Sequence, residues 1–290
     1  MTYLIELLIS GLSMGAIYGL IAMGFAIIYK STGLVNFAQG EITMIVAYVA
    51  WTIATHVSGN IVMVSLGAIA FACLFGLAIE RVIIRPMIGE PIFSTIMVTI
   101  GIAVILRSSI IFVWDAVPHS LDVGVGRDVL VIGDARVRSG QLGVISLLLL
   151  AIAGFYAFFR WSRFGVAMRA VASDDRTAML MGVSAARVQA VAWAASSVIA
   201  GIAGVMFAII HELSPTMFVL GLKSFPATIL GGLDSVLGSA LGGFIMGAVE
   251  NLAGGYISSG MKEVSGFVVI IVILMVRPFG LFGERRIERV

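Results

Sequence analysis

Residues 160–187 read RWSRFGVAMRAVASDDRTAMLMGVSAAR and lie between two long apolar runs, residues 142–159 and 188–210. Alanine, methionine and leucine favour one or two short helices in this polar stretch, and Gly182 favours a break between helices. Five arginines stand against two aspartates, and arginine in a loop beside apolar spans marks the cytoplasmic side of a membrane. The sequence therefore predicts a helical, basic, cytoplasmic loop that is suited to docking a soluble partner.

The composition of the whole chain supports a membrane setting. Of its 290 residues, 60% are hydrophobic and 12% are charged, whereas soluble domains carry about 25% charged residues. The net charge is +2, with the arginine excess in loops and in the C-terminal tail, a pattern that reports orientation in a bilayer and not nucleic-acid binding. The lone Cys73 rules out an intrachain disulfide.

Long apolar runs predict an all-α, polytopic membrane protein. A helix needs about 20 apolar residues to cross the hydrocarbon core, and by this measure residues 1–290 form a single transmembrane domain of about 8–9 helices. The continuous candidates are residues 3–29, 41–55, 60–79, 93–114, 142–159, 188–210, 235–251 and 264–276. In the first of them, Gly11, Gly15 and Gly19 recur every four residues, which predicts a smooth face for a closely packed neighbour.

Residues 211–238 are apolar but broken by proline and glycine, so that no continuous span fits. The loop at 160–187 and the arginine-bearing tail at 277–290 both belong on the cytoplasmic side, so an even number of crossings must separate them. Residues 218–230 are therefore expected to cross as a short segment, with a re-entrant loop as the alternative. The N-terminus and the loop at 115–141, with a short hairpin over 129–137, then lie outside.

Two interrupted stretches point to a transport path. Residues 30–40 and 214–234 are polar or broken, and each follows a similar string, GFAII at 24–28 and VMFAII at 205–210; chance similarity between apolar runs is the alternative. Unwound backbone at membrane depth must line a cavity or be buried in protein, and paired breaks in two halves are typical of transporters. The residues expected along the path are Asn36, Gln39, Glu41, Pro226, Gly231 and Gly232.

Other ionisable groups have simpler interpretations. Glu6, Glu80, Arg107 and Lys223 lie close enough to the ends of spans to reach the interface. The three histidines are far apart and have no metal-ligand spacing, and no nucleophilic triad or phosphate-binding glycine loop is present in the sequence. The sequence thus predicts a chain that is not an enzyme and holds no cofactor. If ATP is consumed, another chain binds it.

Three strings carry a family resemblance: GLSMGAIYGLIAMGFAIIYKSTGLVNFAQGEI at 11–42, GLKSFPATILGGLDSVLGSALGGFIMGAVENL at 221–252, and RPFGLFG at 277–283. They resemble bacterial branched-chain amino acid ABC transporter permeases of the LivH type. The resemblance implies an inner-membrane importer subunit that pairs with a second, LivM-like permease, two ATP-binding subunits and a periplasmic substrate-binding protein. Permeases for urea, short amides or other amino acids remain alternatives, as does an ion-coupled secondary transporter.

The same resemblance assigns residues 160–187 to the contact with the ATP-binding subunits. Importer permeases often carry Glu-Ala-Ala, three residues and then Gly in this region. Ala178 and Gly182 match that pattern, whereas Arg176 and Thr177 replace the glutamate and the first alanine. The coupling residues expected on this basis are Arg169, Asp174, Asp175, Arg176, Ala178 and Gly182.

Overall fold

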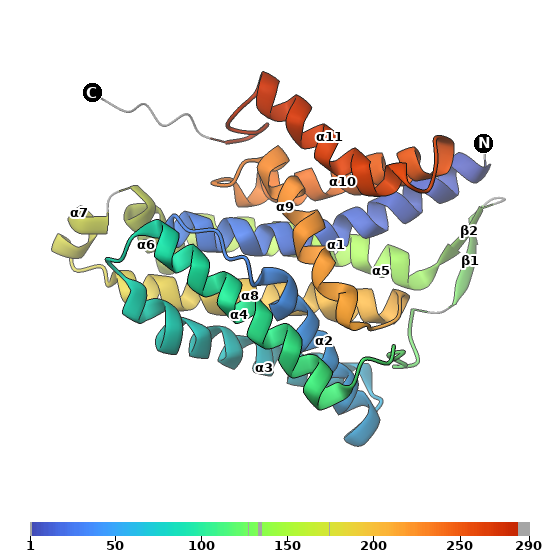
Figure 1. Cartoon of the computed structure of the whole chain (residues 1–290), viewed down its shortest axis with the longest axis horizontal. Coiled ribbons are helices and arrows are strands. Elements are labelled where there is room, and N and C mark those ends of the chain that lie inside the picture. Colours follow the sequence, from blue (N-terminus) through green and yellow to red (C-terminus); the bar gives the residue numbers. More distant parts are fainter. Residues whose placement is uncertain (1, 127, 133–134, 174, 284–290) are drawn as a thin grey trace.

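The structure, a computed structural model, describes residues 2–126, 128–132, 135–173 and 175–283 and is almost entirely helical (Figure 1). Its helices are α1 (Thr2–Thr32), α2 (Gln39–His56), α3 (Ile61–Ile79), α4 (Ile92–Trp114), α5 (Ser139–Trp161), α6 (Arg163–Ser173), α7 (Asp175–Leu180), α8 (Ala185–Ile210), α9 (Val219–Gly231), α10 (Val236–Tyr256) and α11 (Met261–Val276). Short π and 3₁₀ turns, Glu80–Ile84 and Arg85–Met87, extend α3, and the 3₁₀ turn Pro215–Phe218 precedes α9.

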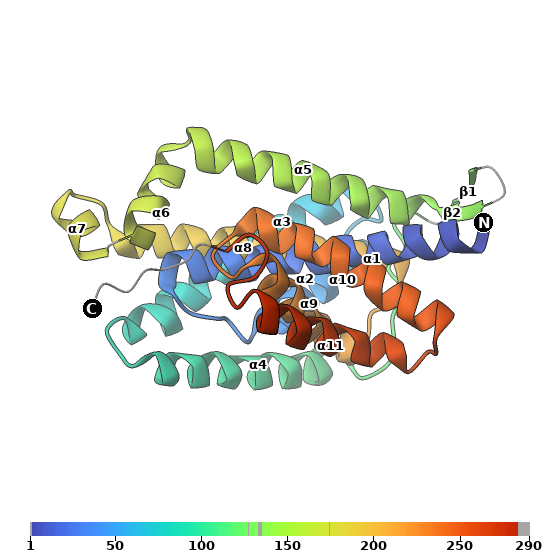
Figure 2. The ribbon, with the colours of Figure 1, turned by 90° about the horizontal axis from the view of Figure 1, so that it is seen from above.

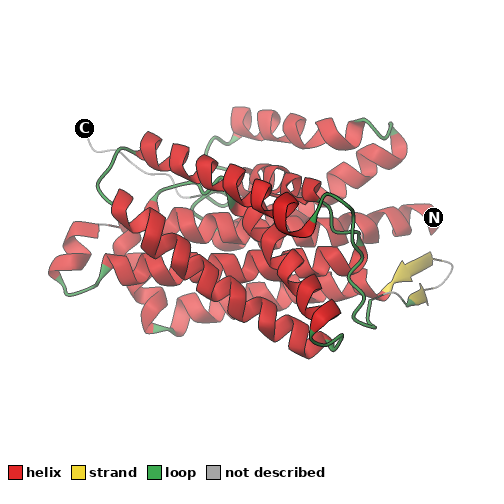
Figure 3. Cartoon of the chain, turned by 60° about the horizontal axis from the view of Figure 1, so that its bottom comes forward, coloured by secondary structure: helices red, strands yellow, loops and turns green. Residues whose placement is uncertain are grey.

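The predicted all-α membrane fold is confirmed. Six helices within the described part of the chain, namely α1, α3 with its extension, α4, α5, α8 and α10, are long and apolar enough to cross a bilayer. The shorter helices α2, α9 and α11, of 18, 13 and 16 residues, correspond to the other predicted spans. The predicted hairpin is also present, as antiparallel strands β1 (Val129–Ile132) and β2 (Ala135–Arg138) beside the N-terminus (Figure 3).

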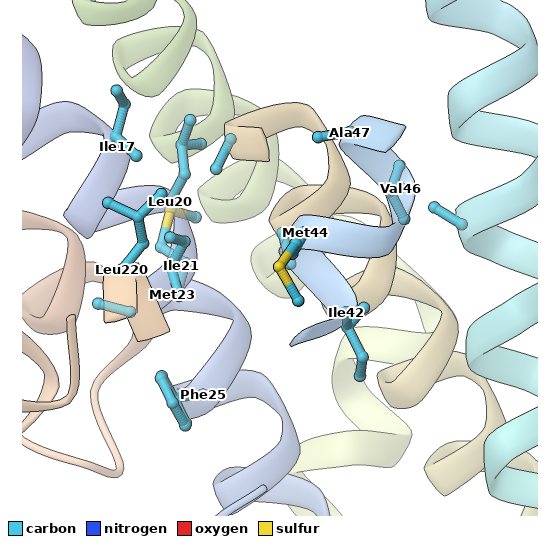
Figure 4. Packing of buried hydrophobic residues seen from close by; sticks show 14 of the residues in the cluster. Ile17, Leu20, Ile21, Met23, Phe25, Ile42, Met44, Val46, Ala47 and Leu220 are labelled. Atoms are coloured by element: carbon cyan, nitrogen blue, oxygen red, sulfur yellow. The ribbon is translucent and has the colours of Figure 1, made fainter. Parts of the chain in front are cut away.

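Helix α1 runs through the centre of the bundle, and α4 and α5 lie at opposite edges (Figure 2). Most residues of α3, α4 and α5 are only partly buried or exposed, whereas most of α1 is buried. Ile17, Leu20 and Ile21 of α1 are fully buried, and the close-up in Figure 4 shows them near Leu220 of α9, with Met44 of α2 across the core. A helix that is apolar on all sides lies in a protein core or in lipid, and α1 is enclosed by other helices of the bundle.

The glycine stripe of α1 packs against a second stripe on α10. A Cβ atom added to Gly15 would lie 2.7 Å from the carbonyl oxygen of Gly243, and one added to Gly11 would lie 2.9 Å from that of Gly247. The residue numbers run in opposite directions, so the two helices are antiparallel. The predicted close neighbour is thereby confirmed, because only glycine permits backbones to approach this far.

The bundle has two distinct ends (Figure 2). At the hairpin end, which comprises the start of α1, the described residues of 115–141 and residues 211–214, Glu6 accepts a hydrogen bond from the Arg136 amide and His119 pairs with Leu213. At the basic end, which comprises residues 30–34, the described residues of 160–187, and residues 231–235 and 277–283, Lys30 donates to the carbonyl of Asp234. The loop at 160–187 and the beginning of the tail therefore share one end, as predicted.

The short helix α9 connects these two ends. Its preceding turn follows Leu213 at the hairpin end, and it finishes at Gly231, whose carbonyl accepts a hydrogen bond from Phe282 at the basic end. A helix of 13 residues spans about 20 Å at 1.5 Å per residue, and the residues before it cover the remaining depth. Residues 214–231 together therefore run from one end of the bundle to the other, which agrees with the predicted short crossing and not with a re-entrant loop.

Two halves of the chain repeat the same packing in opposite directions. In the first, α1 leads through a break at residues 33–38 into α2; in the second, α8 leads through residues 211–218 into α9. Helix α10 packs antiparallel to α1, and α3 packs antiparallel to α8, where a Cβ on Gly76 would lie 2.6 Å from the Trp193 carbonyl oxygen. The paired interruptions predicted from the sequence thus occupy matching places in two inverted halves.

Candidate translocation pocket and coupling surface

The two interrupted segments meet where α2 and α9 begin. A Cβ atom added to Gly40 would lie 2.3 Å from the Phe218 carbonyl oxygen and 3.1 Å from Gly221 Cα. Asn36 prepares the start of α2, because its side-chain oxygen accepts a hydrogen bond from the Ala38 amide at 3.1 Å. This helix crossing is tight because glycine on both sides removes any side chain between the backbones.

A pocket of about 180 Å³ opens beside this crossing. Its wall is drawn from both halves of the chain and is mainly apolar. The lining residues are Phe25, Phe37, Gly40, Glu41, Ile100, Ala103, Val104, Arg107, Phe218, Gly221, Leu222 and Phe225. Solute-binding sites typically combine such an apolar wall with a few placed polar groups, and here Glu41 and Arg107 supply the charged side chains.

Glu41 and Arg107 form an ion pair inside the bundle. The Arg107 Nη2 atom donates to Glu41 Oε1 at 2.6 Å, with the Glu41 side chain 4% exposed and that of Arg107 38% exposed. The Phe218 ring lies against the guanidinium, with 3.3 Å from the ring centroid to Cζ. Two charges within a membrane protein are costly to desolvate, and pairing offsets part of that cost. The pair joins α2 to α4, and Phe218 adds the turn that leads into α9.

Asn36 and Gln39 belong to a neighbouring polar network buried between α1, α2 and α8. Asn36 Nδ2 donates to Gln39 Oε1 at 3.1 Å, and Gln39 Nε2 donates to Ser196 Oγ at 3.0 Å. Ser196 in turn donates to the Gly24 carbonyl at 2.9 Å. Since buried polar groups cost free energy unless they are paired, this network fixes the unwound segment before α2 against the two long helices.

The residues predicted for a path are thus distributed over several places. Glu41 lines the pocket, whereas Asn36, Gln39, Pro226, Gly231 and Gly232 are outside the described set of lining residues. Pro226 is buried within α9, and Gly231 and Gly232 pack against Gly238 and Gly283 at the basic end. Their contribution to a path stays a prediction.

Of the pocket residues, Glu41 alone was among those predicted for a path, and Arg107 is the charged residue that sequence reasoning missed. It was assigned to the interface because it lies in the outer part of a span, yet it stands about two helical turns before Trp114, where α4 ends. At 1.5 Å per residue that is about 10 Å inside the helix end. The signal was therefore present in the spacing, because an arginine at that depth needs a partner.

The loop at 160–187 contains two short helices, α6 and α7, as predicted, and projects from the basic end (Figure 1). Gly182 follows them with φ of +85°, a conformation that favours glycine. Ala178 is buried, and Arg169 donates to the carbonyl of Phe159. Leu180 and Met181 are 87% and 81% exposed. A protruding apolar tip of this kind is typical of a surface that binds another protein.

Three of the predicted coupling residues, or their side chains, lie outside the part of the chain that the structure describes. Asp174 lies outside the described residues. Asp175 and Arg176 belong to the backbone of α7, and their side chains lie outside the description. The coupling role of all six residues stays a prediction. Among the described residues, no group of three histidine, cysteine, aspartate or glutamate side chains could hold a metal ion.

The comparisons with known proteins agree with this architecture. The family model described as "Branched-chain amino acid transport system / permease component" matches residues 7–277. The high-affinity branched-chain amino acid transport system permease protein LivH of Escherichia coli K12 is 31% identical over 99% of this chain and 98% of its own length. Permease protein BraD of Pseudomonas aeruginosa is 27% identical over 99% and 98%, respectively.

A more distant relative is the probable branched-chain amino acid transport permease protein LivH of Methanocaldococcus jannaschii, 26% identical over 91% of this chain and 88% of its own length. No solved structure gives a significant match. The family model and the relatives cover nearly the whole chain, including both interrupted segments and the loop between α5 and α8. This chain belongs to the family of permease components of branched-chain amino acid transport systems.

Proposed function

We propose that this chain is the transmembrane permease subunit of an ABC importer, and that it moves leucine, isoleucine and valine across the bacterial inner membrane. The observation that carries the proposal is the family match over residues 7–277 together with relatives whose names specify branched-chain amino acid transport. The transport energy comes from ATP bound by separate subunits, and the permease itself carries out no covalent chemistry.

The coupling surface supports a partner on the basic end. Leu180 and Met181 are among the most exposed apolar side chains of the described residues. Helix α7, which ends at Leu180, lies beyond the ends of α5 and α8 (Figure 2). Basic residues in the same loop support a position on the cytoplasmic side, where ATP-binding subunits would dock. Movement of this surface reaches the bundle directly, because α6 packs on α5 and α8 and contacts α1.

The pocket supports a solute path at mid-bundle. It lies where the two inverted halves meet, which is where alternating-access transporters hold their solutes. Its open side is formed by Val104 and Leu222, which are 56% and 55% exposed. In the complete transporter a second, LivM-like permease pairs with this chain. A periplasmic substrate-binding protein delivers the amino acid to the hairpin end.

Co-purification tests the proposal. The chain, carrying an affinity tag, is expressed with the genes for candidate ATP-binding subunits and extracted in mild detergent. The proposal expects an ATP-binding subunit to remain with the tagged chain after purification and to hydrolyse ATP. Recovery of the chain free of any ATP-binding subunit, from membranes that retain its transport activity, would count against it.

A further inference from the structure

We propose that Glu41 and Arg107 form a binding site for the two charged groups of the transported amino acid, with Glu41 receiving the ammonium group and Arg107 the carboxylate. This inference rests on the proposed function and extends it to particular atoms. The family match does not identify these residues, and their arrangement in the pocket wall is what points to this chemistry.

The ion pair between Glu41 and Arg107 leaves part of its hydrogen-bonding capacity unused. A single hydrogen bond, from Nη2 to Oε1, joins Arg107 to Glu41, and the Arg107 Nε atom is buried without an acceptor among the described residues. By contrast, Arg85 and Glu80, in the turns that extend α3, form a two-bond fork, with Nε to Oε1 at 3.1 Å and Nη2 to Oε2 at 2.9 Å. Arg107 therefore keeps donor capacity for a second carboxylate, which a guanidinium binds best in fork geometry.

The two charges of a free amino acid complement those of Glu41 and Arg107. An amino acid at neutral pH carries one positive and one negative group, so its net charge is zero. When it binds between Glu41 and Arg107, each protein charge exchanges one oppositely charged partner for another, and no buried charge is left unpaired. A solute with only one of the two charges would leave either the carboxylate or the guanidinium without compensation, which is strongly unfavourable in a low-dielectric site.

The rest of the pocket wall is suited to an aliphatic side chain. Phe25, Phe37 and Phe225 bring aromatic surface to the pocket, and Val104 and Leu222 form its open edge. Burial of an aliphatic side chain against such groups is favourable in proportion to its apolar area. The volume of about 180 Å³ is below the roughly 300–1,000 Å³ of sites for drug-sized molecules, which suits a single small amino acid.

The ion pair lies beside α2 and α9, the two helices that follow the interrupted segments. Glu41 lies in the first turn of α2, directly after the unwound segment, and Phe218 covers Arg107 from the turn that leads into α9. Insertion of a solute between Glu41 and Arg107 separates α2 from α4 and displaces Phe218. Binding of a solute at this site therefore changes the helix packing at the point where the two halves of the chain meet.

The experiment measures protection of the pocket in the assembled transporter. Val104→Cys is introduced with Cys73→Ser, so that a single cysteine lines the pocket, and the complex with its partner subunits is reconstituted in liposomes. The rate of labelling by a membrane-permeant maleimide is then measured. Leucine at ten times its dissociation constant should slow labelling about tenfold, following simple site occupancy.

Two analogues test the charge requirement in the same complex without further mutation. Isoamylamine lacks the carboxylate and 4-methylpentanoate lacks the ammonium group, and at the leucine concentration neither should change the labelling rate by more than twofold. Glu41→Gln and Arg107→Gln should each remove protection by leucine. Glu80→Gln, which removes the buried carboxylate of the Glu80–Arg85 ion pair, is the matched control and should preserve protection.

The outcomes separate this inference from the proposed function. ATP-driven leucine uptake with no protection of Val104→Cys, or equal protection by either analogue, overturns the assignment of Glu41 and Arg107 and leaves the importer proposal standing. The importer proposal is contradicted by a separate result, namely the absence of ATP-driven leucine uptake by the same complex. If Glu41→Gln fails to assemble, the analogue series alone decides the assignment.

Discussion

Gly40 and Gly221 lie against each other with no side chain between their backbones, and a Cβ atom added to Gly221 would be 2.5 Å from Gly40 Cα. Each glycine stands near the start of a helix that follows an unwound segment, one in each half of the chain. This contact brings the two interruptions together and sets the pocket beside them. Its integrity is therefore the structural condition on which the path depends.

Gly40→Val tests that contact. The added side chain would meet the Phe218 carbonyl and the Gly221 backbone, so the substitution should destabilise the protein by about 1–3 kcal/mol, as overpacking does. Thermal unfolding of the purified protein in detergent measures the change. Gly101→Val is the control, because no described atom lies within 4 Å of a Cβ added there. Equal melting temperatures for the two variants would show that the helices cross elsewhere.

Ser196→Ala tests the buried polar network. The change removes the acceptor for Gln39 Nε2 and the donor to the Gly24 carbonyl, and an unpaired buried polar group costs about 1–3 kcal/mol. Ser197→Ala is the adjacent control: Ser197 is equally buried, but its hydroxyl has no hydrogen-bond partner among the described residues, so its loss should be nearly neutral. The same thermal measurement applies, and a larger effect at Ser197 would contradict the assigned network.

Gly182→Pro tests the coupling loop. Proline cannot adopt the φ of +85° at this position, and it removes the amide that donates to the Met179 carbonyl at 3.0 Å. Leucine uptake should fall below a tenth of its normal rate while the amount of protein in the membrane is unchanged. Gly89→Pro, in an exposed turn with φ of +94°, should retain uptake. Normal uptake by Gly182→Pro would remove the loop from the coupling mechanism.

Leu180→Asp tests the exposed tip of the same loop. Because Leu180 is 87% exposed, the substitution should leave folding unaffected, yet a charge placed in an apolar contact should displace the ATP-binding subunits. The measurement is the quantity of ATP-binding subunit that co-purifies with the tagged chain. Val131→Asp, an exposed position in β1 at the hairpin end, should leave that quantity unchanged. Loss of the subunit from both variants would indicate a general effect of added charge.

The large elements of the fold were predictable from sequence because the bilayer restricts them. Apolar length identified the spans, and the glycine spacing of α1 identified a face that packs against α10. The arginine content of residues 160–187 and of the tail placed both at one end, and from that requirement followed the crossing by α9. These signals are local or depend only on counting crossings, so one chain was enough to interpret them.

The site was less predictable because it depends on contacts between distant residues. Glu41 was expected along the path from its place in an interrupted segment, but its partner Arg107 is 66 residues away, on a helix whose sequence suggested an interfacial arginine. Asn36 and Gln39 were grouped with Glu41 because they are neighbours in sequence, whereas their hydrogen bonds lead to Ser196 on α8. Polar residues in a span announce that a partner exists without indicating which helix supplies it.

We infer that this chain conducts amino acids under the control of an ATP-binding partner, and uptake by the reconstituted complex tests this inference most directly. Proteoliposomes that contain the permease, its partner permease, the ATP-binding subunits and the binding protein are supplied with labelled leucine. Uptake should require ATP on the side of the membrane that carries the ATP-binding subunits, persist with a protonophore and stop when this chain is omitted. Leucine uptake by this chain alone, driven by a proton or sodium gradient without ATP, would contradict it.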